Sequence, residues 1–157
     1  MLLIGAIWGS SFLFIKILTP QVGPMALVHM RLLIASIFLA PFFIRKRHLV
    51  NFKQQLIPIT LLALFNAIFP FYLFAVASLQ LTAGTLAILN GLTPLFTFIL
   101  SVLWLKSDYK LIQFLGIILG IIGLYIFVGY DSINFSLVPV ILCLFAAIMY
   151  AFGTNYL

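Results

Sequence analysis

Charged residues are scarce in this sequence, and acidic ones are almost absent. Of its 157 residues, 66% are hydrophobic and only 6% are charged, and glutamate does not occur. A soluble domain carries about 25% charged residues to keep its surface in water. A water-soluble fold with so few polar side chains would expose large apolar patches. We therefore expect an integral membrane protein.

Several kinds of catalytic and metal site are excluded by missing residues. The only two acidic side chains, Asp108 and Asp131, lie between apolar runs, so no carboxylate pair is available for acid/base catalysis. The sequence has no nucleophile elbow, no His-Glu-x-x-His motif and no glycine loop that would bind phosphate. Cys143 is the single cysteine, which allows no intramolecular disulfide and supports no cysteine-based metal site. We predict that the protein is not an enzyme and needs no cofactor or metal.

Six apolar runs occupy most of the chain. They lie at about 2–18, 25–44, 56–78, 84–105, 111–128 and 136–157. Each is close to the roughly 20 residues that cross a bilayer as a helix, and lipid requires the backbone to be hydrogen-bonded internally. Because the connections are short, neighbouring helices must be antiparallel. We predict an all-α fold, a polytopic membrane helix bundle.

The distribution of basic residues predicts an orientation. Half of the eight basic residues fall in the connection at 45–55, namely Arg45, Lys46, Arg47 and Lys53. The connection at 106–110 is also net positive, whereas those at 19–24 and 79–83 are uncharged. Basic connections face the cytoplasm. We therefore predict a plasma membrane protein with a cytoplasmic amino terminus, and this clustering argues against nucleic-acid binding.

Small residues at helical spacing indicate close packing between helices. Gly5 and Gly9 form a G-x-x-x-G motif in the first run, and Gly116 and Gly120 form another in the fifth. Such motifs let two helix backbones approach each other in lipid. Packing within the chain and association with a second copy of it are both compatible with these motifs.

Polar side chains form a stripe in the fourth run. At ~100° per residue, the stripe fills one arc of about 80° on the helix, and its members are Asn90, Thr93, Thr97 and Ser101. They can hydrogen-bond to neighbouring helices or to their own backbone, or they can line a wet cavity. Pro94 in this run and Pro70 in the third each predict a kink.

Two basic residues fall inside predicted helices. We expect Lys16 to extend toward the lipid headgroups, because a long basic side chain can reach them from a helix end. Arg31 lies deeper, and we expect it to have a structural role or to bind an anionic group. A lone histidine near an interface, such as His29, is expected to be structural.

Several short motifs follow one another along the chain. They are Trp8-Gly9-Ser10-Ser11-Phe12 with Lys16, Pro24 with Arg31-Leu32-Leu33, Ala83-Gly84-Thr85-Leu86-Ala87, Leu92-Thr93-Pro94-Leu95-Phe96-Thr97, and Gln113 to Gly123. Their order and spacing resemble the EamA-type domain of the drug/metabolite transporter superfamily. The resemblance implies a carrier of small organic metabolites or drugs that works by alternating access. An alternative is a membrane assembly or subunit protein that transports nothing.

The resemblance also implies an organisation in repeats. Members of this family have two five-helix repeats, and an odd number of helices inverts the second repeat in the membrane. We expect residues 1–130 to form one repeat and residues 131–157 to begin a truncated second one. The segment 150–154, Tyr-Ala-Phe-Gly-Thr, is a weak echo of Trp8-Gly9-Ser10-Ser11. Because the first and last runs stop without polar flanks, we expect the chain to be part of a longer protein.

Candidate substrate-binding residues are the polar and aromatic side chains of the first four runs. An aromatic face with a polar edge, or a side-chain amide or hydroxyl, can hold a solute inside a bundle, although each also serves as an ordinary packing residue. The predicted set is Trp8, Ser10, Ser11, Arg31, Asn66, Tyr72, Asn90 and Thr93.

Overall fold

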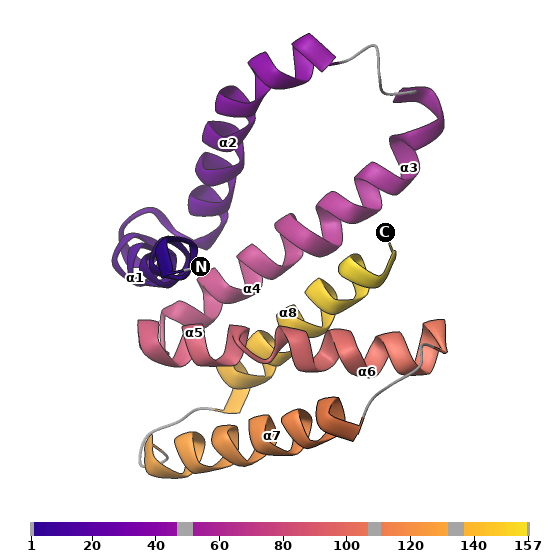
Figure 1. The fold of residues 1–157 in the computed structure, drawn as a ribbon. Coiled ribbons are helices and arrows are strands. Elements are labelled where there is room, and N and C mark those ends of the chain that lie inside the picture. The colour runs from indigo at the N-terminus through magenta and orange to yellow at the C-terminus, as the bar shows by residue number, and fades with distance from the viewer. Residues whose placement is uncertain (1, 47–51, 107–110, 132–136, 157) are drawn as a thin grey trace.

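The computed structural model describes residues 2–46, 52–106, 111–131 and 137–156, which form helices joined by short turns. The described residues contain no strand, and the predicted all-α fold is confirmed (Figure 1). In chain order the helices are α1 (Leu2–Val22), α2 (Pro24–Lys46), α3 (Phe52–Ala63), η2 (Leu64–Ile68), α4 (Phe69–Ser78), α5 (Ala83–Asn90), α6 (Thr93–Leu105), α7 (Leu111–Asp131) and α8 (Leu137–Tyr156).

Each predicted run corresponds to one helix or to a run of consecutive helices. The third run contains α3, η2 and α4, and the fourth contains α5 and α6. Within the described residues, four segments are long and apolar enough to cross a membrane, and a shorter apolar helix covers Ile112–Gly123. The four are Pro24–Arg45, Gln55–Ser78, Ala83–Trp104 and Leu137–Tyr156. The chain is therefore a multi-pass membrane protein. Its orientation stays a prediction, because the connection at 47–51 lies outside the described residues.

A glycine in the left-handed region joins α1 to α2. α1 continues through Pro20 to Val22, beyond the predicted end at residue 18. Gly23 has a φ of +83°, which side chains other than glycine rarely adopt, and its N–H donates to the Thr19 carbonyl at 2.9 Å. Pro24 then opens α2, where a proline needs no N–H. This turn lets α1 and α2 pack against each other.

The last helix lies at the centre of the packed bundle. α8 packs against α4, α5, α6 and η2, and Figure 1 shows it running between α4 and α6. Its buried face consists largely of small residues, namely Cys143, Ala146, Ala147, Ala151 and Gly153. Small side chains allow helices to approach closely where lipid gives no hydrophobic drive for association. The predicted small-residue motifs lie in other helices, at Gly5 and Gly9 and at Gly116 and Gly120, and this face of α8 was not among them.

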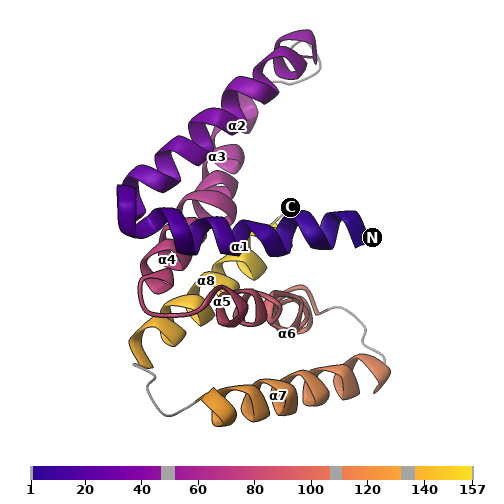
Figure 2. The same ribbon diagram turned by 90° about the vertical axis from the view of Figure 1, so that its left-hand side faces the viewer.

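α7 lies at the edge of the molecule, beside α6 (Figures 1 and 2). Its Gly120 is near Leu95 of α6, because an added Cβ would lie 3.5 Å from the Leu95 Cδ1. A Cβ added at Gly9 or Gly116 would meet nothing within 4 Å, and the surroundings of Gly5 lie outside what the structure describes. Helix association through these motifs therefore stays a prediction.

Candidate functional site

A π-helical turn places Asn66 in the middle of the third span. In η2 the Phe69 N–H bonds to the Leu64 carbonyl, five residues back. Pro70 accounts for this turn, because in an α-helix its ring would collide with the Asn66 carbonyl four residues earlier. The extra residue changes which side chains share a face. Asn66 lines a cavity together with Phe71 and Phe74, five and eight residues further on.

The fourth span is interrupted at Gly91 and Leu92. α5 ends at Asn90, and α6 begins at Thr93 with Pro94 in its first turn, a position that requires no N–H from proline. The predicted distortion at Pro94 therefore takes the form of a break in the helix. The Thr93 hydroxyl next to this break is buried and has no hydrogen-bond partner. Unpartnered buried polar groups are rare, and each calls for an explanation.

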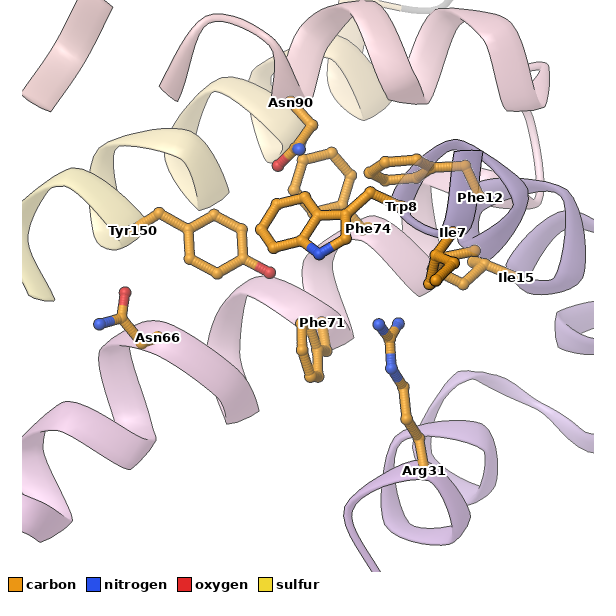
Figure 3. A pocket seen from close by; sticks show the side chains of 11 residues that line it. Ile7, Trp8, Phe12, Ile15, Arg31, Asn66, Phe71, Phe74, Asn90 and Tyr150 are labelled. Atoms are coloured by element: carbon orange, nitrogen blue, oxygen red, sulfur yellow. The ribbon is translucent and has the colours of Figure 1, made fainter. Parts of the chain in front are cut away.

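A cavity of about 290 Å³ lies where α1, α2, η2, α4, α5 and α8 meet, and we name it the aromatic cavity. Its lining residues are Ile7, Trp8, Ser11, Phe12, Ile15, Arg31, Asn66, Phe71, Phe74, Asn90 and Tyr150. Figure 3 shows the Arg31 guanidinium, the Trp8 indole and the Tyr150 hydroxyl directed into the same space. Helices distant in sequence therefore bring a cation and several aromatic faces together.

Arg31 is the charged side chain on the wall of the aromatic cavity. Its Cζ lies 4.1 Å from the centroid of the Phe71 ring, which is a cation–π distance. The Phe71 ring meets the Tyr150 ring edge to face, with centroids 6.4 Å apart. The aromatic cavity has no acidic lining residue. The guanidinium is therefore oriented by an aromatic face and is not neutralised by a carboxylate of the wall.

A second cavity of about 800 Å³ adjoins the first, and we name it the polar cavity. It shares Trp8, Asn66, Asn90 and Tyr150 with the aromatic cavity. Its other lining residues are Gly91, Thr93, Pro94, Thr97, Phe98, Ser101, Thr154 and Asn155. The four residues of the predicted polar stripe all lie on its wall.

The polar stripe also makes hydrogen bonds. The Thr97 hydroxyl donates to the Thr93 carbonyl at 2.8 Å, within α6. The Asn155 amide nitrogen donates to the Thr97 carbonyl at 3.0 Å and to the Ala151 carbonyl at 2.9 Å, which ties α8 to α6. Two of the three possibilities that the sequence left open therefore occur, namely lining a cavity and a hydrogen bond back to the same helix. The bond to a neighbouring helix is accepted by the Thr97 backbone carbonyl and not by a side chain of the stripe.

A groove of about 560 Å³ between α1, α2 and α4 adds one predicted residue, Ser10, to those that line the cavities. Ser10 and Ser11 line it, and Arg31 borders both this groove and the aromatic cavity. The Ser10 hydroxyl donates to the Ile7 carbonyl of its own helix at 2.9 Å. A hydroxyl that is bonded in this way has less capacity to hold a solute.

The structure brings together most of the predicted binding residues. Trp8, Ser11, Arg31, Asn66 and Asn90 line the aromatic cavity, and Thr93 lines the polar cavity. Tyr72 lines neither of them and is absent from the groove as well, with 39% of its surface exposed. Whether these residues bind a solute stays a prediction.

Three residues of this region were not among the predicted ones. Phe71 orients Arg31, Tyr150 borders both cavities, and Asn155 bonds to α6. Tyr150 carried a signal, because it begins the segment that echoes Trp8-Gly9-Ser10-Ser11. Asn155 carried a signal as well, an amide within the sixth apolar run, although its partner on α6 could not be read from it. Phe71 carried none, since its role depends on the π turn.

Lys16 contacts the protein itself, contrary to the expectation that it would extend to headgroups. Its ammonium donates to the Ser78 carbonyl at 2.8 Å, linking α1 to the last residue of α4. Carbonyls at the end of a helix lack intrahelical partners and carry partial negative charge, so a cation there is favourable. The lysine therefore holds α1 against the turn between α4 and α5.

Comparison with known proteins identifies a family and two relatives from different bacteria. The model of the EamA-like transporter family matches residues 1–129. The chain is 28% identical over 151 residues to the "Uncharacterized inner membrane transporter YedA" of Escherichia coli strain K12, an alignment that covers 96% of this chain and 49% of that protein. It is 27% identical over 124 residues to "Protein PagO" of Salmonella typhimurium, covering 78% and 41% respectively. The chain spans about half the length of these curated relatives. No solved structure matches it significantly.

Proposed function

Because the chain belongs to the EamA-like transporter family, we propose that it forms part of a carrier that moves small organic metabolites or drugs by alternating access. The observation that carries this proposal is the pair of adjoining cavities between apolar helices, of which the larger is open to the surroundings. Polar side chains within a membrane span are costly and usually mark a substrate path. Pockets for small molecules combine apolar walls with a few placed polar groups, as these two cavities do.

The shared wall of the two cavities is the proposed gate. Trp8, Asn66, Asn90 and Tyr150 belong to α1, η2, α5 and α8, and each borders both spaces. A solute passing from one cavity to the other must pass these four side chains. Because four different segments supply them, a small shift of α1 relative to α8 would open or close the passage.

We also propose the orientation and the repeats that the sequence predicts. In this proposal the protein lies in the plasma membrane and its amino terminus faces the cytoplasm. The orientation follows from the basic connection at 45–55, because basic connections remain on the cytoplasmic side. Residues 1–130 form one five-helix repeat, and α8 begins an inverted second repeat that works together with it. The inner membrane named for one relative supports this location.

The test is solute exchange in liposomes containing the full gene product that includes residues 1–157. Vesicles would be loaded with an isotopically labelled metabolite extract and placed in an unlabelled pool of the same metabolites. Mass spectrometry would then identify the labelled solutes that cross the membrane. We expect the wild type to exchange a small set of organic solutes and Asn90→Leu to lose at least ten-fold in rate. Thr60→Val is the matched control, because its exposed hydroxyl bonds only to its own helix. If no solute moves under any imposed gradient, a non-transporting assembly or subunit role replaces this proposal.

A further inference from the structure

Arg31 is the one charged residue among the described residues that line the two cavities and the groove. The groove and the aromatic cavity share Arg31, and the residues lining the three spaces include no carboxylate. The sequence offers only two acids, Asp108 and Asp131, of which the first lies outside the described residues and the second ends α7. A solute in the aromatic cavity therefore meets a positive charge and no negative one.

The position of Arg31 favours an anionic partner. A cation within an apolar bundle is unfavourable unless a compensating group accompanies it. The Phe71 ring offers a face at 4.1 Å, but a ring quadrupole attracts a cation less strongly than a carboxylate does. The ring leaves the edge of the guanidinium open, and its fork of N–H donors matches two carboxylate oxygens. Figure 3 shows that this end of the side chain points into the cavity.

The walls beyond Arg31 are apolar and flat. The Phe74 ring stacks near Tyr150 with centroids 6.4 Å apart, and its other contact is an edge-to-face pair with Phe12 at 5.5 Å. Trp8 borders the same space. Aromatic faces pack well against a planar apolar body at little entropic cost, since each ring has few rotatable bonds.

Uncharged hydrogen-bonding groups lie on the far side. Asn66 and Asn90 border the aromatic cavity where it adjoins the polar one, and the Thr93 hydroxyl beyond them is buried without a partner. These groups can bond to a neutral polar substituent, but they offer no charge to a cation. The arrangement is thus asymmetric, with a cation at one end and amides and a hydroxyl at the other.

We propose that the aromatic cavity binds small planar organic anions, with a carboxylate on Arg31 and the apolar body against Trp8, Phe71 and Tyr150. This inference names the substrate class of the carrier proposed above and rests on that function. It predicts that organic cations bind more weakly than anions of the same shape, because the described residues that line the cavity give them no carboxylate to pair with.

Binding to the chain in lipid nanodiscs tests the inference without any transport. The chain has two tryptophans, Trp8 and Trp104, so Trp104→Phe leaves the emission of Trp8 alone to report on the aromatic cavity. Benzoate, benzamide and benzylammonium are nearly equal in shape and differ in charge at neutral pH. We expect benzoate to change the emission of Trp8 saturably, with half of the change reached at a concentration at least ten-fold lower than with benzamide. Benzylammonium should give the weakest change.

Arginine variants then assign the preference to one residue. Arg31→Gln should weaken benzoate binding at least ten-fold and leave benzamide binding unchanged, whereas Arg31→Lys should retain part of the preference. Arg45→Gln is the matched control, because Arg45 is exposed at the other end of α2. Circular dichroism and thermal unfolding of each variant would verify that the fold is retained.

Four results would overturn the inference: equal affinity for benzoate and benzamide, tightest binding of benzylammonium, no saturable change with any of the three probes in folded protein, or unaltered benzoate binding by folded Arg31→Gln. The outcomes that would reject the carrier function differ from those that would reject this inference. Selective benzoate binding without solute exchange in liposomes would keep the inference and reject transport. Exchange of neutral or cationic solutes alone would reject the inference and keep transport.

Discussion

Gly153 of α8 lies directly against the side chain of Asn66 in η2. A Cβ placed on Gly153 would be 2.8 Å from the Asn66 Cγ and 2.9 Å from both the amide oxygen and the amide nitrogen. Real Cβ atoms do not approach other atoms so closely, so only glycine fits here without a shift. The position of Asn66 at the junction of the two cavities therefore depends on a missing methyl group on another helix.

Gly153→Ala is expected to displace the Asn66 side chain and to be less stable than Gly9→Ala. Overpacking costs about 1–3 kcal/mol, and we expect no more than the lower end of this range, because the contacted atoms are the end of the flexible Asn66 side chain and can turn away. Gly9→Ala is the matched control, since alanine favours both helices equally and a Cβ at Gly9 meets nothing within 4 Å, so that a lower midpoint of thermal unfolding in detergent reports on the contact alone. A Gly153→Ala protein as stable as Gly9→Ala would contradict the close contact.

Thr93→Val is expected to separate stability from function. The hydroxyl is buried and unpartnered, so its replacement by a methyl group should raise the free energy of unfolding by about 1 kcal/mol. If the hydroxyl serves a solute, the same variant should exchange that solute more slowly. Thr19→Val is the comparison variant, because the buried Thr19 hydroxyl donates to the Ile15 carbonyl at 2.6 Å. Loss of that hydrogen bond should not raise the free energy of unfolding. Lower stability of Thr93→Val would mean that the hydroxyl has a structural partner.

Lys16→Met is expected to loosen α1 from the rest of the bundle. It removes the ammonium from the Ser78 carbonyl and leaves that end of α4 without its partner. Hydrogen bonds to charged groups contribute about 1.5–3 kcal/mol, and we expect the lower end of this range because the pair is only partly buried. Chemical unfolding in detergent measures the loss, with Arg45→Met as the control. An equal effect of both variants would show that the contact adds nothing.

The orientation of the chain can be tested with single cysteines. In a Cys143→Ser background, Arg45→Cys places one thiol at the end of α2 beside the basic connection, and Gln80→Cys places one on the turn between α4 and α5. The two thiols should face opposite sides of the membrane. We expect an impermeant maleimide to label Gln80→Cys in intact cells and Arg45→Cys only after the cells are opened, because basic connections remain in the cytoplasm. The reverse pattern would invert the proposed topology.

The spans could be predicted from the sequence, whereas the shape of the site could not. Long apolar runs fix the helices because lipid leaves the backbone no alternative. Trp8, Arg31 and Asn90 were predicted because polar or amphipathic groups in such runs are exceptional. Their convergence with Tyr150 depends on α8 packing between α4 and α6, which a pattern within one helix does not record.

Tyr72 was predicted for its residue type, an aromatic face with a polar edge, and it lies away from the cavities. Six residues at ~100° each place it about 120° from Asn66 even on a regular helix. Phe71 is the residue whose face depends on the π turn, because regular spacing would place it about 140° from Asn66 and the extra residue brings it to the wall of the same cavity. Pro70 signalled a distortion, but not its kind.

The π turn also makes the lining of the aromatic cavity sensitive to a single codon. Deleting one residue from η2 would rotate everything from Pro70 to Ser78 by about 100° relative to Asn66, at the cost of placing the Pro70 ring against the carbonyl four residues back. Phe71 would leave the guanidinium, and other side chains of α4 would take its place beside Arg31. In-frame insertion or deletion at this point is thus an evolutionary step that could change the chemistry of the binding surface without substituting any of its residues.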